Sequence, residues 1–182
     1  MTAQEALQAQ LKSTEQILSR LVADLTDADL LVRPVDKANT IAWQLGHLIV
    51  AEQSMGKQIP GAQYPDLPAG FAEQHAMEKT AADPAKGGFR TKTEYVDLFS
   101  KARAASIAAV GKLTDADLDK PTSGNMAKYV PTVGSLVTLL ANHTLTLRLS
   151  EGSGVFAGES VTRRLDRLAL ALGLDATTEL AA

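Results

Sequence analysis

Histidine carries most of the potential for metal or acid–base chemistry in this chain. The sequence contains three histidines, His47, His75 and His143, and no cysteine. The lack of cysteine excludes a disulfide framework, a thiolate metal site and a cysteine nucleophile. A neutral imidazole is a good ligand for zinc, nickel or iron, so the spacing of the histidines decides what chemistry they can support.

Two of the histidines lie in segments with helical periodicity. His47 shares a helix face with Trp43 and Gln44, whereas His143 follows Leu140 on the apolar stripe of a later helix. Helix bundles place metal ligands on facing helices in the bundle interior. We therefore predict that the imidazoles of His47 and His143 lie near each other inside the fold, where they are candidate ligands for a divalent metal, zinc or nickel.

A third ligand for that metal is missing from its expected position. A catalytic zinc uses three protein ligands and a water molecule. On the helix of His143 the next ligand belongs four residues on, because positions four apart share a face, and that position holds Leu147. His75 reaches the pair only if the long segment around it folds over them. The alternative is that His47 and His143 are hydrogen-bonded core histidines.

The elements that must position these histidines are predicted to be helices. Capping boxes begin at Thr2 and Thr91, and Thr40 and Thr132 stand where helix N-caps are expected. No segment alternates β-branched and polar residues, so no sheet is expected. The predicted fold class is all-α, a four-helix bundle with a short C-terminal helix in a single domain over 1–182. The predicted helices run over 3–24, from 39 or 40 to just before Pro60, over 91–113, from 132 through 147, and over 159–172.

The connection between the second and third predicted helices is long. Residues 57–90 are rich in proline and glycine, which interrupt helices. A connection of this length is uncommon inside a compact domain and is often functional. The alternative is a surface crossover that joins distant helix ends.

The hexapeptide LTDADL occurs twice, at residues 25–30 and 113–118. Each copy closes a predicted helix and precedes a loop, a threonine cap and a second helix with one histidine. We interpret this order as two pseudo-symmetric helix–loop–helix halves. The alternative, which is compatible with the first, is that LTDADL is a favourable helix-end and N-cap sequence used twice.

Composition excludes several classes of protein. The chain has 182 residues, 45% of them apolar, and a net charge of −3. This balance excludes nucleic-acid binding driven by bulk positive charge, and it excludes a disordered acidic chain. No apolar stretch reaches the ~18 residues of a membrane span, and no signal peptide is visible, so we expect a cytoplasmic protein. The alanine-rich stretch KARAASIAAV would allow close contact between helices, and a homodimer is expected.

Four sequence elements together resemble the DinB-like superfamily of metal-dependent bacterial proteins. They are TIAWQLGHL (40–48), DLPAGFAEQH (66–75), FRTKTEYVDLF (89–99) and ANHT (141–144). The resemblance implies a four-helix bundle with an unusual crossover and a three-histidine metal site. His47 matches one ligand, and His143 matches the first histidine of an H-x-x-x-H pair whose second place is held here by Leu147.

The resemblance also implies a class of chemistry. Known activities in the family are thiol transfers and isomerisations that use low-molecular-weight thiols, with a metal that activates the thiol or water. One hypothesis is therefore a DinB-like protein with a degenerate metal site, acting on a small molecule as a thiol transferase, isomerase or hydrolase. In this hypothesis the copy has either lost its metal or completes the site with another group. The other is a non-catalytic module for helical dimerisation or small-ligand binding. Whether the chain is an enzyme stays open at this point.

Overall fold

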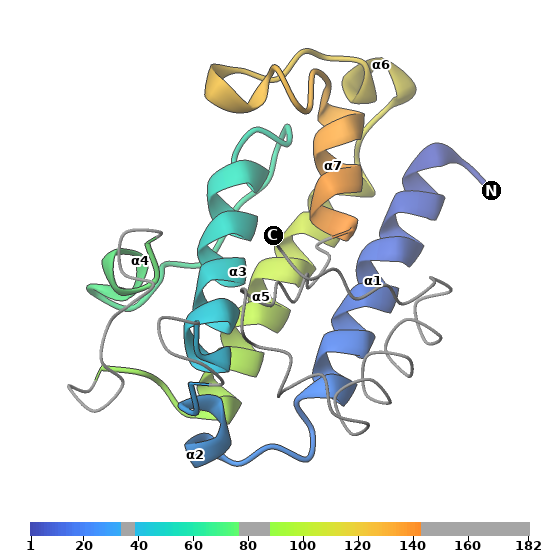
Figure 1. Ribbon diagram of the computed structural model, residues 1–182. Helices are drawn as coiled ribbons and strands as arrows, with labels where there is room; N and C mark the ends of the chain where they lie inside the picture. The colour runs from blue at the N-terminus through green and yellow to red at the C-terminus, as the bar shows by residue number, and fades with distance from the viewer. Residues whose placement is uncertain (34–38, 77–87, 143–182) are drawn as a thin grey trace, which may run out of the picture. The chain divides into compact units, whose positions relative to one another are not determined.

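Four long helices form the framework of the part of the chain that the structure describes (Figure 1). The computed structural model describes residues 1–33, 39–76 and 88–142. The described residues form no β-strand, which confirms the predicted all-α fold class. The long helices are α1 (Ala3–Leu21), α3 (Ile41–Gly56), α5 (Lys92–Val110) and α7 (Val133–Ala141). The short ones are α2 (Asp27–Leu30), α4 (Phe71–Gln74), α6 (Asp115–Leu118) and the 3-10 turn η3 (Gly124–Met126).

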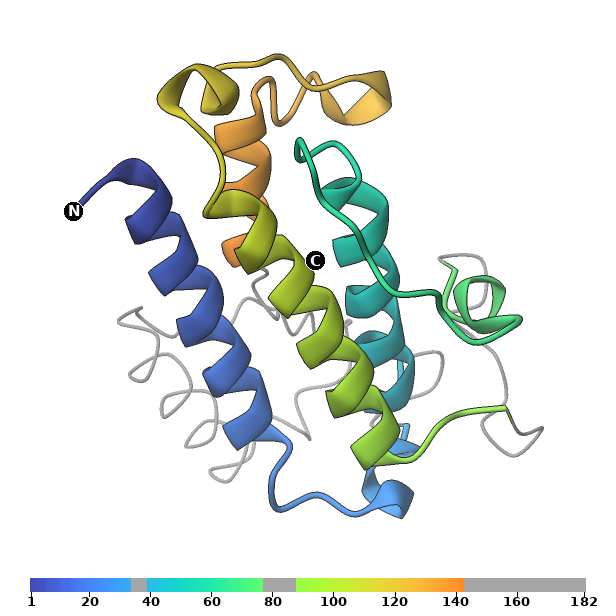
Figure 2. The same ribbon diagram turned by 180° about the vertical axis from the view of Figure 1, so that it is seen from behind.

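The directions of the long helices explain the long connection. Helices α1 and α7 run one way and α3 and α5 run the other, as both views show (Figures 1 and 2). Helix α5 packs against α1 and α3, and α7 packs against the same two helices. Because α3 and α5 are parallel neighbours, the chain must return along the bundle before α5 can begin. We call residues 57–91 the crossover segment; it contains α4, and its residues 77–87 lie outside the described part.

The predicted starts of the four long helices are confirmed, because they depend on local capping chemistry. Each long helix begins after a threonine whose side-chain oxygen accepts a backbone N–H from the first turn. These N-caps are Thr2, Thr40, Thr91 and Thr132.

Helix ends are predicted less well than helix starts. Helix α1 ends at Leu21 and α5 at Val110, each three residues before the predicted end. In both cases the threonine of LTDADL, Thr26 or Thr114, has the extended backbone of an N-cap and begins the next short helix. The long helix must therefore end before that threonine.

The two LTDADL copies begin short helices, which corrects the prediction that they close long ones. In α2 and α6 the threonine and the aspartate three residues later form a capping box. The leucine that ends each copy, Leu30 or Leu118, is buried. Helices α2 and α6 lie at opposite ends of the bundle (Figure 1). The order long–short–long therefore occurs twice, and both interpretations of the repeat agree with it.

A buried ion pair joins the long helices at the bundle centre. Arg103 Nη2 of α5 lies 2.9 Å from Glu52 Oε2 of α3, with side chains 1% and 0% exposed. A second guanidinium nitrogen, Nη1, donates to Thr14 Oγ1 of α1 and to the Leu140 carbonyl of α7, at 3.3 Å each. Ser106 Oγ donates to Glu52 Oε1 at 2.6 Å. Burial raises the pKa of the Glu52 carboxyl, while Arg103 and Ser106 oppose that rise.

Several predictions concern residues that the structure does not describe. His143, Leu147 and the predicted helix 159–172 are among them, so these stay predictions. All described residues belong to one compact unit, Met1–His143. The predicted single domain over 1–182 is therefore untested. In the described part, no helix combines the length and the apolar character that crossing a membrane requires.

We expect Arg103→Met to lower the free energy of unfolding by about 3–5 kcal/mol, because it leaves the Glu52 carboxylate buried without its partner. Urea unfolding followed by circular dichroism measures the change. The control is the double variant Arg103→Met with Glu52→Leu, which removes both charges. It should recover much of the loss, and a double variant as unstable as the sum of two losses would contradict this account.

We expect Thr91→Ala to lower the free energy of unfolding by about 1 kcal/mol, because the α5 capping box loses its oxygen. Hydrogen bonds from Thr91 hold the pKa of Glu94 below its usual value. The backbone N–H and the hydroxyl of Thr91 both donate to the Glu94 carboxylate, and the variant loses only the hydroxyl's bond. The stability that comes from this hydroxyl bond is present above the usual glutamate pKa and is lost as the pH falls. The matched control is Thr93→Ala, an exposed threonine on the same helix, which should leave stability unchanged or slightly higher. Equal losses in both variants would contradict the capping role.

Candidate functional site

His47 lies half-buried on α3 with its ring held against the ring of Trp43. The two ring centroids are 4.7 Å apart and the planes differ by 9°, a stacked pair. The contact arises because residues four apart in a helix lie on one face, as the sequence predicts for these two. Trp43 is 4% exposed, so it supports His47 from the protein interior.

A hydrogen bond to the crossover segment determines that Nδ1 of His47 carries a hydrogen. Its Nδ1 lies 3.0 Å from the backbone carbonyl oxygen of His75. A carbonyl oxygen only accepts, so Nδ1 carries the hydrogen and donates it. In the neutral ring, Nε2 then holds a lone pair. Metal-ligating histidines show the same pattern: one nitrogen donates to a carbonyl and the other binds the metal.

His75 itself is a hydrogen-bonded core histidine. It is fully buried, so the crossover segment does fold over α3 at this point. Its Nδ1 donates to the Phe71 carbonyl at 2.8 Å, and its Nε2 accepts from the Tyr95 hydroxyl at 2.8 Å. The Tyr95 oxygen in turn lies 3.4 Å from the Arg90 amide, which donates to it. Burial lowers the pKa of His75, so the ring is neutral with both nitrogens occupied, and it has no free lone pair for a metal.

A glycine allows this close packing. A Cβ at Gly46 would lie 2.0 Å from His75 Cδ2, far inside van der Waals contact. Gly46 and Tyr95 contact His75, and the sequence analysis gave neither residue a role. Gly46 stands directly before His47 in the element TIAWQLGHL, and its lack of a side chain was the available signal.

The predicted meeting of His47 and His143 stays a prediction, because His143 lies outside the described residues. Helix α7, which His143 follows, does pack against α3. Within residues 1–33, 39–76 and 88–142, no group of three or more His, Cys, Asp or Glu side chains is placed to hold a metal ion. His47 thus presents one ring nitrogen with a lone pair, and the described part does not complete a metal site around it.

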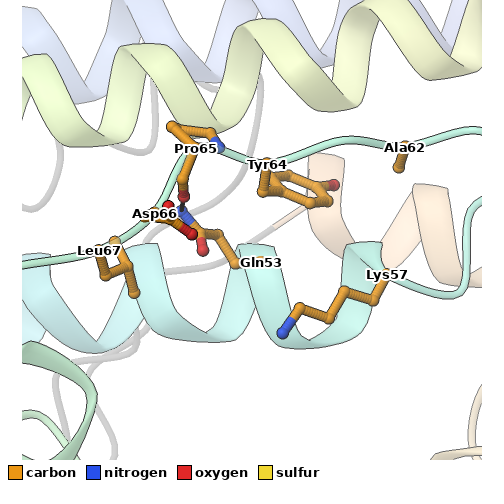
Figure 3. A pocket seen from close by; sticks show the side chains of 7 residues that line it. All are labelled: Gln53, Lys57, Ala62, Tyr64, Pro65, Asp66 and Leu67. Carbon is orange, nitrogen blue, oxygen red and sulfur yellow. Dashed lines mark hydrogen bonds between the residues drawn. The ribbon is translucent and has the colours of Figure 1, made fainter.

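A second feature of the crossover segment is a cavity of about 350 Å³ near the end of α3 (Figure 3). Its Tyr64 hydroxyl lies 2.8 Å from Ser106 Oγ and so joins the network of Glu52 and Arg103. Burial raises the pKa of Tyr64 to about 12, so the phenol is neutral near pH 7. The lining residues are Gln53, Lys57, Ala62, Tyr64, Pro65, Asp66 and Leu67.

Tyr64 reaches α5 past a second glycine of α3. A Cβ at Gly56 would lie 1.8 Å from the Tyr64 hydroxyl oxygen. Gln53 Nε2 also donates to the Pro65 carbonyl at 3.1 Å, which fixes the crossover backbone beside the cavity. These contacts attach the first part of the crossover segment to α3, as His75 attaches a later part.

Comparison with known proteins agrees with this architecture. A search of curated proteins finds no match to the chain. The family model described as the DinB superfamily matches residues 10–146, which is more than half of the sequence. The match includes α3, α5 and α7 in full, α1 from residue 10 onward, and both His47 and His143. The chain belongs to the DinB superfamily.

Proposed function

We propose that this chain is a metal-dependent protein that acts on a small molecule, with His47 Nε2 as one ligand of a divalent cation, zinc or nickel. The observation that carries the proposal is the hydrogen bond from His47 Nδ1 to the His75 carbonyl, which leaves Nε2 as the lone-pair nitrogen. By resemblance, His143 is the second ligand. The proposed reaction class is thiol transfer, isomerisation or hydrolysis.

The residues around His47 fit one part of such a site. Trp43 fixes the plane of the imidazole, and the His75 carbonyl fixes its tautomer. His75 does not fit as a ligand, because both of its nitrogens are hydrogen-bonded. A bound cation would supply Lewis acidity, which lowers the pKa of a bound thiol or water. The chain's own contribution is to hold the His47 ring in one orientation, with its hydrogen on Nδ1, before the cation binds.

A second candidate function is a non-catalytic module for small-ligand binding or helical dimerisation. Leu147 favours it, because leucine stands where the family's third histidine belongs. The alanine-rich stretch KARAASIAAV (101–110), proposed above for dimer contact, has both buried and exposed alanines. Ala102 and Ala109 are buried in the bundle, whereas Ala104 and Ala108 are exposed. The exposed pair is the part available to a second copy of the chain, and the homodimer remains a proposal.

We expect the purified chain to retain zinc or nickel near one equivalent after mild chelation, and His47→Gln to reduce metal affinity by at least ~10-fold, because a first ligand is lost. Elemental analysis and competition with a chelator measure both quantities. The control is Lys57→Gln, at the opposite end of α3, which should retain the metal. A wild-type chain that binds no metal and forms a concentration-dependent dimer would favour the second candidate.

We expect Leu147→His to raise metal affinity by restoring the H-x-x-x-H spacing after His143. Calorimetric titration with zinc measures the gain. The same substitution in a His47→Gln background should gain less, because one ligand is then absent. No gain in the otherwise unchanged chain would mean that the pocket has been remodelled around Leu147.

A further inference from the structure

We propose that Gly46, His75 and Tyr95 form a positioning device that sets the tautomer of His47. His75 belongs to the crossover segment, Gly46 to α3 and Tyr95 to α5. None of the three touches a substrate or a metal in this account. They act through one atom, the backbone carbonyl oxygen of His75, which accepts from His47 Nδ1 at 3.0 Å. The inference rests on the proposed function for its purpose, but its test needs no metal.

The His75 carbonyl reaches His47 across 28 residues of sequence, so its position must be fixed by tertiary contacts. The imidazole of the same residue supplies them. One nitrogen donates to the Phe71 carbonyl one turn earlier, and the other accepts from Tyr95 on α5. With the ring held at both nitrogens, the attached backbone carbonyl has little freedom to move away from His47.

Gly46 determines whether the ring can occupy this position. The His75 ring lies directly over the α3 backbone, where a Cβ would approach its Cδ2 to 2.0 Å. A single methyl group at position 46 must therefore displace the ring. Displacing the ring also moves the His75 carbonyl that accepts from His47. The substitution at position 46 thus affects His47 through His75, without changing His47 itself.

The hydrogen bonds form a chain with one consistent direction. The Arg90 amide donates to the Tyr95 oxygen, and the Tyr95 hydroxyl donates to His75 Nε2. His75 Nδ1 then donates to the Phe71 carbonyl, which can only accept. Because each donor has one acceptor, the His75 ring is satisfied in a single tautomer. The ring therefore holds its place without a charge in the core.

The position of the His75 carbonyl determines which neutral tautomer of His47 is populated. With the carbonyl in place, Nδ1 holds the hydrogen and Nε2 presents a lone pair. Without the carbonyl, the ring loses its directional partner and exchanges between both forms. If His75 only filled space in the core, its displacement would not change the tautomer of His47. The tautomer of His47 therefore distinguishes a positioning role of His75 from a packing role.

The test uses the full-length, metal-free, nitrogen-15-labelled chain at about pH 8, where histidine is neutral. Long-range proton–nitrogen spectra show which ring nitrogen bears the hydrogen, and the His47→Gln spectrum assigns the signals. We expect His47 to carry its hydrogen on Nδ1 in the wild-type chain. In Gly46→Ala we expect loss of this single form, with a substantial Nε2–H population.

The matched control is Gly56→Ala, which places a methyl group 1.8 Å from the Tyr64 hydroxyl on the same helix. It disturbs a comparable contact but should leave the His47 tautomer unchanged. If Gly46→Ala does not fold, Tyr95→Phe decides, because it removes only the hydroxyl that donates to His75. A folded Gly46→Ala or Tyr95→Phe with the wild-type tautomer would overturn the inference.

Two further outcomes would also overturn it: a wild-type His47 with its hydrogen on Nε2, or an equal change in Gly56→Ala. The metal measurements are independent of these results. A chain with the expected tautomer and no metal retains the positioning device and loses the proposed function. A chain that binds metal while His47 carries its hydrogen on Nε2 retains the proposed function and loses the positioning device.

Discussion

The ion pair between Arg103 and Glu52 is the interaction on which the arrangement of the helices depends. A guanidinium buried to 1% exposure needs a charge partner and hydrogen-bond acceptors at fixed places, because unpaired buried charge is costly. The acceptors come from α1, α3 and α7, so one side chain of α5 constrains the other three long helices. The pair sets the axial position of α3 against α5, and α3 carries Trp43, Gly46 and His47.

The crossover segment contacts the pair of helices α3 and α5 at two places. At Gly56 the Tyr64 hydroxyl passes α3 to reach Ser106, and at Gly46 the His75 ring passes α3 to reach Tyr95. The partner side chains, Ser106 and Tyr95, both belong to α5, and both glycines belong to α3. The parallel pairing of α3 and α5 requires the long return of the chain, and the two glycines allow that return to lie close against the bundle.

The sequence predicted what depends on neighbouring residues and missed what depends on distant ones. Threonine caps and the Trp43–His47 stack involve residues three or four apart, so spacing alone indicated them. The LTDADL helices were missed because the same residues suit the end of one helix and the start of the next. The role of His75 depends on a partner 28 residues away and on a glycine beneath its ring, and no local pattern reports that geometry.

The central ion pair also has a consequence for how the chain folds. Arg103 is 89 residues from Thr14 and 37 from Leu140, and Ser106 is 54 from Glu52. These contacts close large loops, and loop closure is slow because its entropy must be lost before the contacts form. A partly assembled bundle that buried one of the two charges alone would be strongly disfavoured. The pair therefore penalises intermediates and makes folding of the four helices more nearly all-or-none.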